Sequence, residues 1–217
     1  MQVILFTHLL KLMKTQGKVI IIEGPPGCGK TTFCRSFVQH NSNAVMLEEW
    51  VDHVVLADYI ADMENKATGF QFRAQRETLA KICQAIELAK TGKTVLLDRG
   101  LVGNRCFAEV QYEAGYISSE DMEKYRREFD ASRVLAEKSD GVEIITCYLK
   151  CSAEVAVQRI RSRDRDGESA YTVNYLRNLI DKHDLLVNPT TVVDVSQNHN
   201  VEKGILPRAA TCVLVKV

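Results

Sequence analysis

The chain has 217 residues, a length that suits one domain with enough apolar material for a core. Its 28 basic and 28 acidic side chains cancel to a formal net charge of zero, so bulk charge gives no reason to expect a nucleic-acid or membrane partner. No stretch approaches the roughly 18 consecutive apolar residues of a membrane span. The seven cysteines stand singly, without the spacing of a zinc site or a disulfide framework, which favours a reducing compartment and a cytoplasmic location.

The first 17 residues precede the first predicted strand and form an N-terminal extension. The segment "MQVILFTHLLKLMK" is apolar and lacks acidic residues, but His8 and Lys11 interrupt it. No small-residue cleavage site follows, which disfavours a secretory signal, and the absence of arginine and serine gives little support to a mitochondrial transit peptide. We predict a single domain over residues 1–217, with residues 1–17 as its extension.

Five short apolar runs recur along the chain, separated by longer segments with helical spacing. They span Val19–Glu23, Ala44–Leu47, Thr94–Asp98, Glu143–Leu149 and Thr190–Val195. Each run is almost continuously apolar, as expected for strands buried on both faces. Strands that alternate with helices indicate an α/β fold in three layers, with a five-stranded parallel sheet and helices on both faces.

The first strand runs directly into "GPPGCGKT", which fits the phosphate-loop pattern G-x-x-x-x-G-K-[ST]. Glycines let the backbone turn tightly, so that its N–H groups and the start of the next helix point at an anion. Lys30 can reach the β- and γ-phosphates of a nucleoside triphosphate, and the hydroxyl of Thr31 can bind Mg²⁺. The predicted ATP-binding residues of this loop are Gly24, Pro25, Pro26, Gly27, Cys28, Gly29, Lys30, Thr31 and Thr32.

The second and third strands end in charged residues at the sheet edge where ligands bind in open α/β folds. "LEEW" places Glu48 or Glu49 after the second strand, where a carboxylate can accept a proton from an attacking hydroxyl. "TVLLDRG" places Asp98 and Arg99 at the end of the third. We expect Asp98 to bind Mg²⁺ with Thr31, and Arg99 to stabilise charge on a transferred phosphoryl group.

An arginine-rich segment, "QRIRSRDRDGES" over residues 158–169, follows the fourth strand. It carries Arg159, Arg161, Arg163 and Arg165, which on a helix would project in two adjacent pairs. Alone, such a segment is typical of a solvated charged helix. Together with the phosphate loop it indicates a lid that closes over a triphosphate.

These motifs together resemble the deoxynucleoside kinase family, over most of the chain from about Val19 to Val195. The phosphate loop of that family ends in G-K-[ST]-T, as "GKTT" does here, and its E-R-S motif is similar to "DRG". "YEAG" resembles its Y-E-S-G stretch, and "YLKCSAEVAVQRIRSRDRDGES" resembles its Y-L-x-x-S-P-E-V followed by the arginine lid. A compact, divergent chain of this kind is compatible with a viral member of the family.

The resemblance assigns roles to individual residues. Glu49 stands at the spacing from Lys30 at which the family has its catalytic base, and Gln71 in "GFQ" matches the glutamine that binds the base. Glu168 falls on the glutamate that binds the sugar 3′-hydroxyl, and Tyr59, after a one-residue shift, on the tyrosine that shares this contact. The resemblance further assigns Arg159, Arg163 and Arg165 to ATP, and Tyr59, Phe70, Gln71, Thr78, Arg99, Asn104 and Glu168 to the nucleoside.

The chain also departs from the family pattern. Asp98 replaces a glutamate, which shortens the carboxylate, and the segment between Glu49 and Gln71 is several residues shorter than in the family. At the positions that set base specificity, some members of the family carry an arginine and an aspartate, and others carry apolar residues. This chain has Thr78 and Asn104 there. The preferred base is therefore left open.

The activity that the resemblance implies is transfer of the γ-phosphoryl group of Mg-ATP to the 5′-hydroxyl of a deoxynucleoside, in nucleotide salvage for DNA precursor synthesis, by a homodimer. A nucleoside monophosphate kinase such as thymidylate kinase is an alternative, in which Arg73 or Arg76 would bind the acceptor phosphate. A non-catalytic nucleotide switch is more remote, and the chain lacks the N-K-x-D tetrad of a GTPase.

Overall fold

The computed structural model describes residues 17–49, 52–139, 141–164, 168 and 171–196. Most of the N-terminal extension (residues 1–16) and Arg165 in the predicted lid lie outside the described residues. In chain order the elements are β1 (Lys18–Glu23), α2 (Lys30–His40), β2 (Ala44–Leu47), α3 (His53–Ala61), α4 (Met63–Lys90), β3 (Thr94–Asp98), α5 (Leu101–Glu113), α6 (Ser119–Glu137), β4 (Glu143–Lys150), α7 (Ala153–Arg163), α8 (Val173–Leu186) and β5 (Thr191–Asp194).

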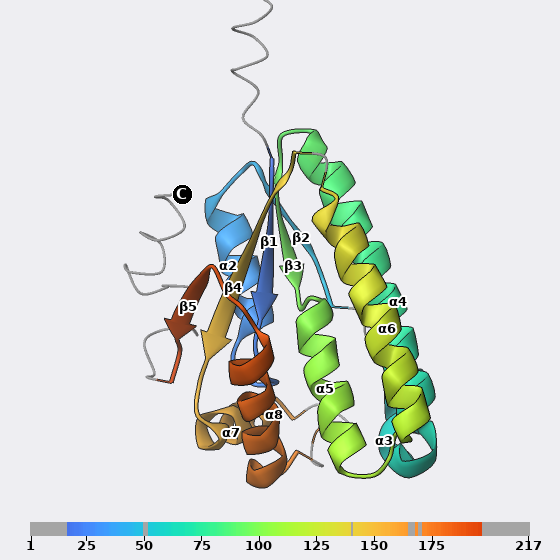
Figure 1. Cartoon of the computed structure of the whole chain (residues 1–217). Coiled ribbons are helices and arrows are strands. Elements are labelled where there is room, and N and C mark those ends of the chain that lie inside the picture. The colour runs from blue at the N-terminus through green and yellow to red at the C-terminus, as the bar shows by residue number, and fades with distance from the viewer. Residues whose placement is uncertain (1–16, 50–51, 140, 165–167, 169–170, 197–217) are drawn as a thin grey trace, which may run out of the picture.

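The five strands form one sheet in the order β2-β3-β1-β4-β5, and every pair is parallel (Figure 1). All five predicted strands are confirmed, with bounds that differ by one residue at most. The central strand β1 pairs with β3 on one side and β4 on the other, so its near-continuous apolar run is buried on both faces. The α/β fold with a five-stranded parallel sheet is thus confirmed.

Alternate residues of β1 enter two separate hydrophobic clusters, one on each face of the sheet. Ile20 and Ile22 pack with residues of α2, α7 and α8, whereas Val19 packs with residues of α3, α4 and α6. Successive side chains of a strand point to opposite faces, so one short apolar run fills both layers of the core. Helix α5 contributes to both clusters, through Cys106 to the first and Ala108 to the second.

Helices α4 and α6 lie side by side along the outer layer (Figure 1). The start of α6 is fixed by Ser118, whose hydroxyl accepts the backbone N–H of Asp121 at 3.1 Å and caps the helix. Tyr125 of α6 meets Phe72 of α4 edge-to-face, with ring centroids 5.5 Å apart. This pair anchors the long helix that supplies one wall of the site described below.

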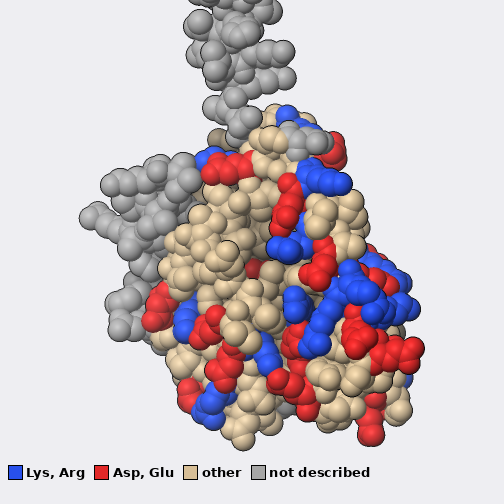
Figure 2. Space-filling model, in the orientation of Figure 1, with Lys and Arg blue, Asp and Glu red and all other residues tan. Residues whose placement is uncertain are grey.

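Charged side chains of both signs are mixed over the face of the molecule shown in Figure 2, and they gather over α4 and α6. This mixture agrees with the zero net charge of the sequence. Within the described part of the chain, no helix combines the length and apolar character that a membrane crossing requires.

Candidate active site

The phosphate loop lies between β1 and α2 at the carboxyl edge of the sheet. Gly24, Gly27 and Gly29 have φ angles of 147°, 80° and 93°, a region that glycine adopts without steric cost. A Cβ on Gly27 would lie 2.5 Å from the carbonyl oxygen of Ala156, so this turn packs on α7 at a distance that only glycine allows. The loop therefore has the backbone of an anion cradle in front of a helix N-terminus.

Lys30 is buried within this loop and also lines the neighbouring cavity. Its Nζ donates hydrogen bonds to the carbonyl oxygens of Gly24 and Pro25, both at 3.0 Å. An ammonium has three donors, so two of them hold the loop closed around the cation. A positive charge fixed in this position is suited to the terminal phosphates of a nucleotide.

Thr31 and Asp98 form a hydrogen-bonded pair of side chains beside the loop. The hydroxyl of Thr31 donates to Asp98 Oδ2 at 2.6 Å, which ties α2 to the end of β3. Asp98 Oδ1 is buried and has no hydrogen-bond partner in the described part of the chain, and burial raises the pKa of Asp98 although the charge of Lys30 opposes this shift. Mg²⁺ binds few protein oxygens and completes its shell with water and phosphate, so this pair fits a magnesium ion.

Arg99 and Glu49 form an ion pair next to these oxygens, in which the Arg99 side chain is buried and that of Glu49 is partly exposed. Arg99 Nε donates to Glu49 Oε1, and the backbone of Arg99 has a positive φ of 71°, which is uncommon for a residue with a side chain. Burial alone would raise the pKa of Glu49, but the positive charges of Arg99 and Lys30 outweigh burial and hold that pKa below its ordinary value. Glu49 is therefore ionised at neutral pH and can accept a proton.

The two adjacent glutamates point in different directions. The Glu48 side chain is exposed and accepts a hydrogen bond from Arg35 at 2.9 Å, whereas Glu49 lines the cavity. Lys81 of α4 donates to the backbone carbonyl of Glu48, and burial lowers the pKa of Lys81. The connection after β2 is thus held from outside by two cations while Glu49 turns inward.

A cavity of about 790 Å³ extends from the phosphate loop to the inner faces of α3, α4 and α5, a size that suits a small-molecule ligand. Away from the loop its walls are largely aromatic and amide side chains. Tyr59 and Phe70 are stacked, with centroids 4.2 Å apart and planes inclined by 8°. Gln71 lies beside them in the wall and is almost fully buried.

Asn104 of α5 contacts Thr78 of α4 across this cavity wall. Its side-chain nitrogen donates to Thr78 Oγ1 at 2.7 Å and to the backbone carbonyl of Ala74 at 3.1 Å. Because that carbonyl can only accept, the amide orientation is fixed and both N–H donors of Asn104 are used. Its side-chain oxygen has no partner among the described residues, and the residue lines the cavity.

The arginines of α7 lie in two different places. Arg163, at the end of the helix, lines the cavity and makes two hydrogen bonds of 2.6 Å to the carboxylate of Glu168. Arg159 instead donates to the backbone carbonyl of Val195, at the end of β5, at 2.8 Å. The described part of the predicted lid thus contributes one arginine to the cavity.

The structure brings most predicted site residues together around one cavity. Those that line it are Pro26, Gly27, Gly29, Lys30, Thr31, Thr32, Glu49, Tyr59, Phe70, Gln71, Thr78, Arg99, Asn104, Arg163 and Glu168. Gly24, Pro25 and Cys28 lie within the loop behind this wall, and Asp98 lies beneath Thr31.

Several residues of the site were not predicted from the sequence. The guanidinium of Arg99 lies over the ring of Phe107, 4.8 Å from its centroid. Tyr171 and Tyr175 also line the cavity, with centroids 5.6 Å apart. No short motif marks these aromatic residues, because a tyrosine pair four residues apart is typical of any packed helix face.

Comparison with known proteins agrees with this geometry. The sequence model of the family described as "Deoxynucleoside kinase" matches residues 20–207. The chain is 26% identical over 164 residues to a deoxyadenosine kinase of Dictyostelium discoideum, covering 76% of this chain and 64% of that protein, somewhat under two thirds of its length. It is 28% identical over 180 residues to a probable deoxycytidine kinase of fowlpox virus, covering 80% of this chain and 72% of that protein.

A solved structure shows the same fold. Deoxyadenosine kinase from M. mycoides with bound dCTP superposes with a TM-score of 0.71 at 21% identity, covering 92% of this chain and 100% of that one. Because the family match extends over most of the sequence, and because the phosphate loop, Arg99 and the cavity occupy one edge of the sheet, the chain belongs to the deoxynucleoside kinase family.

Proposed function

We propose that this protein transfers the γ-phosphoryl group of Mg-ATP to the 5′-hydroxyl of a deoxynucleoside. The observation that carries the proposal is the uneven distribution of charge in the cavity. Among the described residues, the basic side chains of its wall come from α2, the end of β3 and the end of α7, and they are Lys30, Arg35, Arg99 and Arg163. The lining residues that come from α3, α4 and α5 carry apolar, aromatic, amide and hydroxyl groups and no basic side chain, which suits an acceptor without a phosphate of its own.

The donor triphosphate would bind the loop between β1 and α2. The N–H groups of the loop and the ammonium of Lys30 would bind the β- and γ-phosphates, with Arg99 and Arg163 near the transferred group. Thr31 and Asp98 would hold Mg²⁺, which neutralises charge on the phosphates. Catalysis would come mainly from positioning and from fixed positive charge.

Glu49 would orient and deprotonate the acceptor hydroxyl. Two observations support this role of Glu49. It forms an ion pair with Arg99, and the charges of Arg99 and Lys30 hold its pKa below the ordinary value. An ionised carboxylate at this point can accept the proton as the 5′-oxygen attacks the γ-phosphorus in line. Tyr59 and Glu168 would hold the 3′-hydroxyl, which disfavours sugars that lack it.

In our proposal the base subsite favours adenine and cytosine, which carry an amino group at the ring position where guanine and thymine carry a keto oxygen. Asn104 uses both of its N–H donors within the protein and presents an oxygen to the cavity, which can only accept. The amino groups of adenine and cytosine donate hydrogen bonds, whereas the keto oxygens of thymine and guanine do not. Gln71 can pair with the same base edge through one donor and one acceptor.

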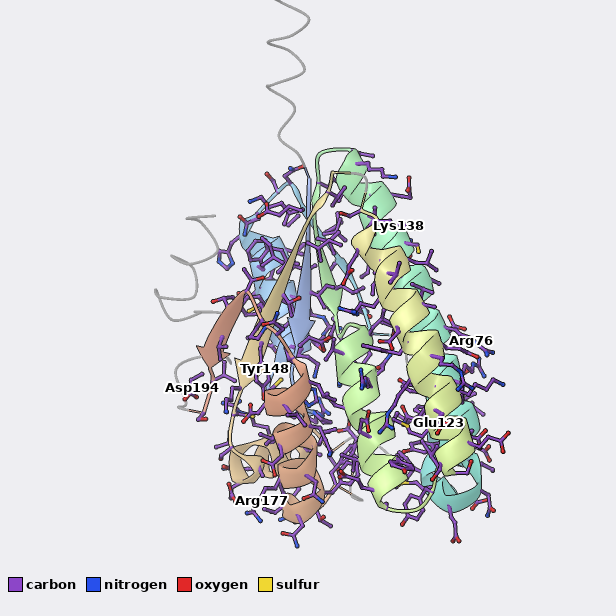
Figure 3. The ribbon with its side chains drawn as sticks, viewed as in Figure 1. Arg76, Glu123, Lys138, Tyr148, Arg177 and Asp194 are labelled. Carbon is purple, nitrogen blue, oxygen red and sulfur yellow. The ribbon has the colours of Figure 1, made fainter. Side chains whose placement is uncertain are left out.

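A nucleoside monophosphate kinase is less well supported. Arg76 binds Glu128 of α6 and lies over the ring of Phe72, on the outer side of the α4–α6 pair (Figure 3). Arg73 lies 3.5 Å from Asp52, and its side chain is exposed. In the described part of the chain neither arginine lines the cavity, so neither is positioned to bind an acceptor phosphate.

Two further features remain proposals. A homodimer agrees with Val134 and Leu135, exposed apolar residues near the end of α6, and light scattering would reveal it. A reducing compartment such as the cytoplasm agrees with the six described cysteines, which are all free thiols.

The deciding experiment offers the purified protein labelled ATP and each of the four deoxynucleosides, with thymidine monophosphate as a separate acceptor. We expect monophosphate products, with kcat/KM for deoxyadenosine and deoxycytidine about tenfold or more above that for thymidine and deoxyguanosine. Product from thymidine monophosphate alone would favour the monophosphate kinase. ATP hydrolysis without any phosphorylated acceptor would contradict the proposed function.

A further inference from the structure

Glu23, the last residue of β1, is a buried carboxylate that the mechanism above does not use. It is 1% exposed and directly precedes the phosphate loop. Its Oε1 accepts the backbone N–H of Gly103 at 3.1 Å, but its Oε2 is buried without a hydrogen-bond partner in the described part of the chain. A buried carboxylate with a hydrogen bond to only one of its oxygens destabilises the folded state. A functional role would explain why Glu23 stands here.

Among opposite charges, that of Arg99 acts most strongly on Glu23, although no hydrogen bond joins Glu23 Oε2 to Arg99 Nη1. Arg99 Nη1 is likewise buried and has no partner among the described residues. A Cβ on Gly103 would stand 2.4 Å from Glu23 Oε2 and 3.3 Å from Arg99 Nη1, so both atoms border the same small space beside α5. Arg99 thus lies between two carboxylates, with Glu49 at its Nε and Glu23 on the side of Nη1.

The same strand end also holds the backbone of Arg99. Its N–H donates to the carbonyl oxygen of Ile22 at 3.0 Å, and its φ of 71° is a strained backbone conformation that the surroundings must hold in place. Fixing the long arginine side chain in one orientation costs rotamer entropy, which a second favourable interaction besides that with Glu49 helps to offset. Burial raises the pKa of Glu23, and the charge of Arg99 is the strongest influence in the opposite direction.

We propose that Glu23 is a positioning residue for Arg99: its carboxylate, held by the Gly103 N–H, fixes the guanidinium toward Glu49 and the transferred phosphoryl group. The inference rests on the proposed function and assigns Glu23 no contact with substrate. It also gives Gly103 a role, because a larger residue there would occupy the space between the carboxylate and the guanidinium. The end of β1 would thereby couple the phosphate loop to the catalytic ion pair.

The test replaces Glu23 by glutamine, which keeps the acceptor for Gly103 but removes the charge. We expect kcat, measured in single-turnover experiments, to fall about 10- to 100-fold, the cost of a misplaced catalytic group, while KM for ATP and for the nucleoside stays within about threefold. The matched control is Glu109→Gln, another buried carboxylate held by arginines, Arg105 and Arg126, but outside the cavity. This control is expected to lower the melting temperature and to leave kcat unchanged.

A double-mutant cycle separates positioning from a merely structural role. If Glu23 acts through Arg99, Glu23→Gln should cost little further kcat in an Arg99→Met background. Should Glu23→Gln fail to fold, Gly103→Ala tests the same contact without changing a charge and should show the same loss of kcat at unchanged KM. Wild-type kcat in Glu23→Gln, or an undiminished loss in the Arg99→Met background, would overturn the inference, whereas a wild-type protein inactive toward every nucleoside would instead overturn the proposed function.

Discussion

The two ends of the cavity are built in different ways. The phosphate end consists mainly of backbone, folded over nine consecutive residues, with one lysine bound inside its own loop. The end that we propose to bind the nucleoside consists of side chains from α3, α4, α5 and the residues before α8, which lie more than 100 positions apart in the sequence. The first end can therefore change little without losing the loop, whereas the second can change its ligand through one or two side chains.

This difference separates what each end contributes to function. Backbone N–H groups and a buried ammonium recognise phosphate whatever the acceptor is. In the proposed function, the amide and aromatic groups on the helices select the base, and the phosphoryl transfer depends on the other end. Glu49 lies between the two ends, since it pairs with Arg99 of the phosphate side and faces the acceptor side.

The largest expected effect on activity comes from removing the carboxylate charge of Glu49. Glu49→Gln should lower kcat about 10²- to 10⁴-fold, the usual range for loss of a general base, while ATP affinity measured by titration stays near that of wild type. The matched control is Glu48→Gln, which changes an exposed neighbour that pairs with Arg35 and should keep kcat within about twofold. If the control is inactive and Glu49→Gln is near wild type, the roles of the two glutamates are reversed.

The sequence predicted the local structure of the proposed phosphate end almost completely. A strand, a glycine-rich turn and a lysine follow one another in the chain, and the structure confirms the five predicted strands. Local residue order is sufficient here because the loop is made from its own backbone. The strand-end residues Asp98 and Arg99 were also predictable, since the carboxyl ends of parallel strands meet at one edge.

The nucleoside end could be predicted only in part. The resemblance named Gln71 and Asn104. Neither spacing nor composition indicated that both N–H donors of the Asn104 amide would bond to Thr78 and Ala74. Phe107 lines the wall without any motif to mark it. Such contacts depend on how helices pack against one another, which a single sequence does not specify.

The second prediction tests whether the proposed nucleoside end alone determines which base is preferred. Asn104→Leu removes the acceptor oxygen and should lower kcat/KM for deoxyadenosine and deoxycytidine about 30-fold, the cost of one unmade polar contact, with a smaller change for thymidine. Lys30→Met is the contrasting variant at the phosphate end and should lower kcat/KM for all acceptors by a similar factor. Equal losses for every base in Asn104→Leu would show that the amide has no part in selection.

The smallest expected effect concerns α8, a helix at the cavity that packs against α5 and α7. It carries Tyr175 of the nucleoside wall, while His183 on the same helix is fully buried and stacks on Tyr148 of β4, with centroids 6.0 Å apart. Burial lowers the pKa of His183 from 6.5 to about 3, so between these values the unfolded chain binds a proton that the folded chain does not. The free energy of unfolding should therefore fall by up to about 1.4 kcal/mol per pH unit as the pH drops below 6.5, through this residue alone. Between pH 6.5 and 5.5, the free energy of unfolding measured in urea should fall by about 1 kcal/mol more in the wild type than in His183→Phe. Equal falls would mean that other groups cause the loss of stability in acid.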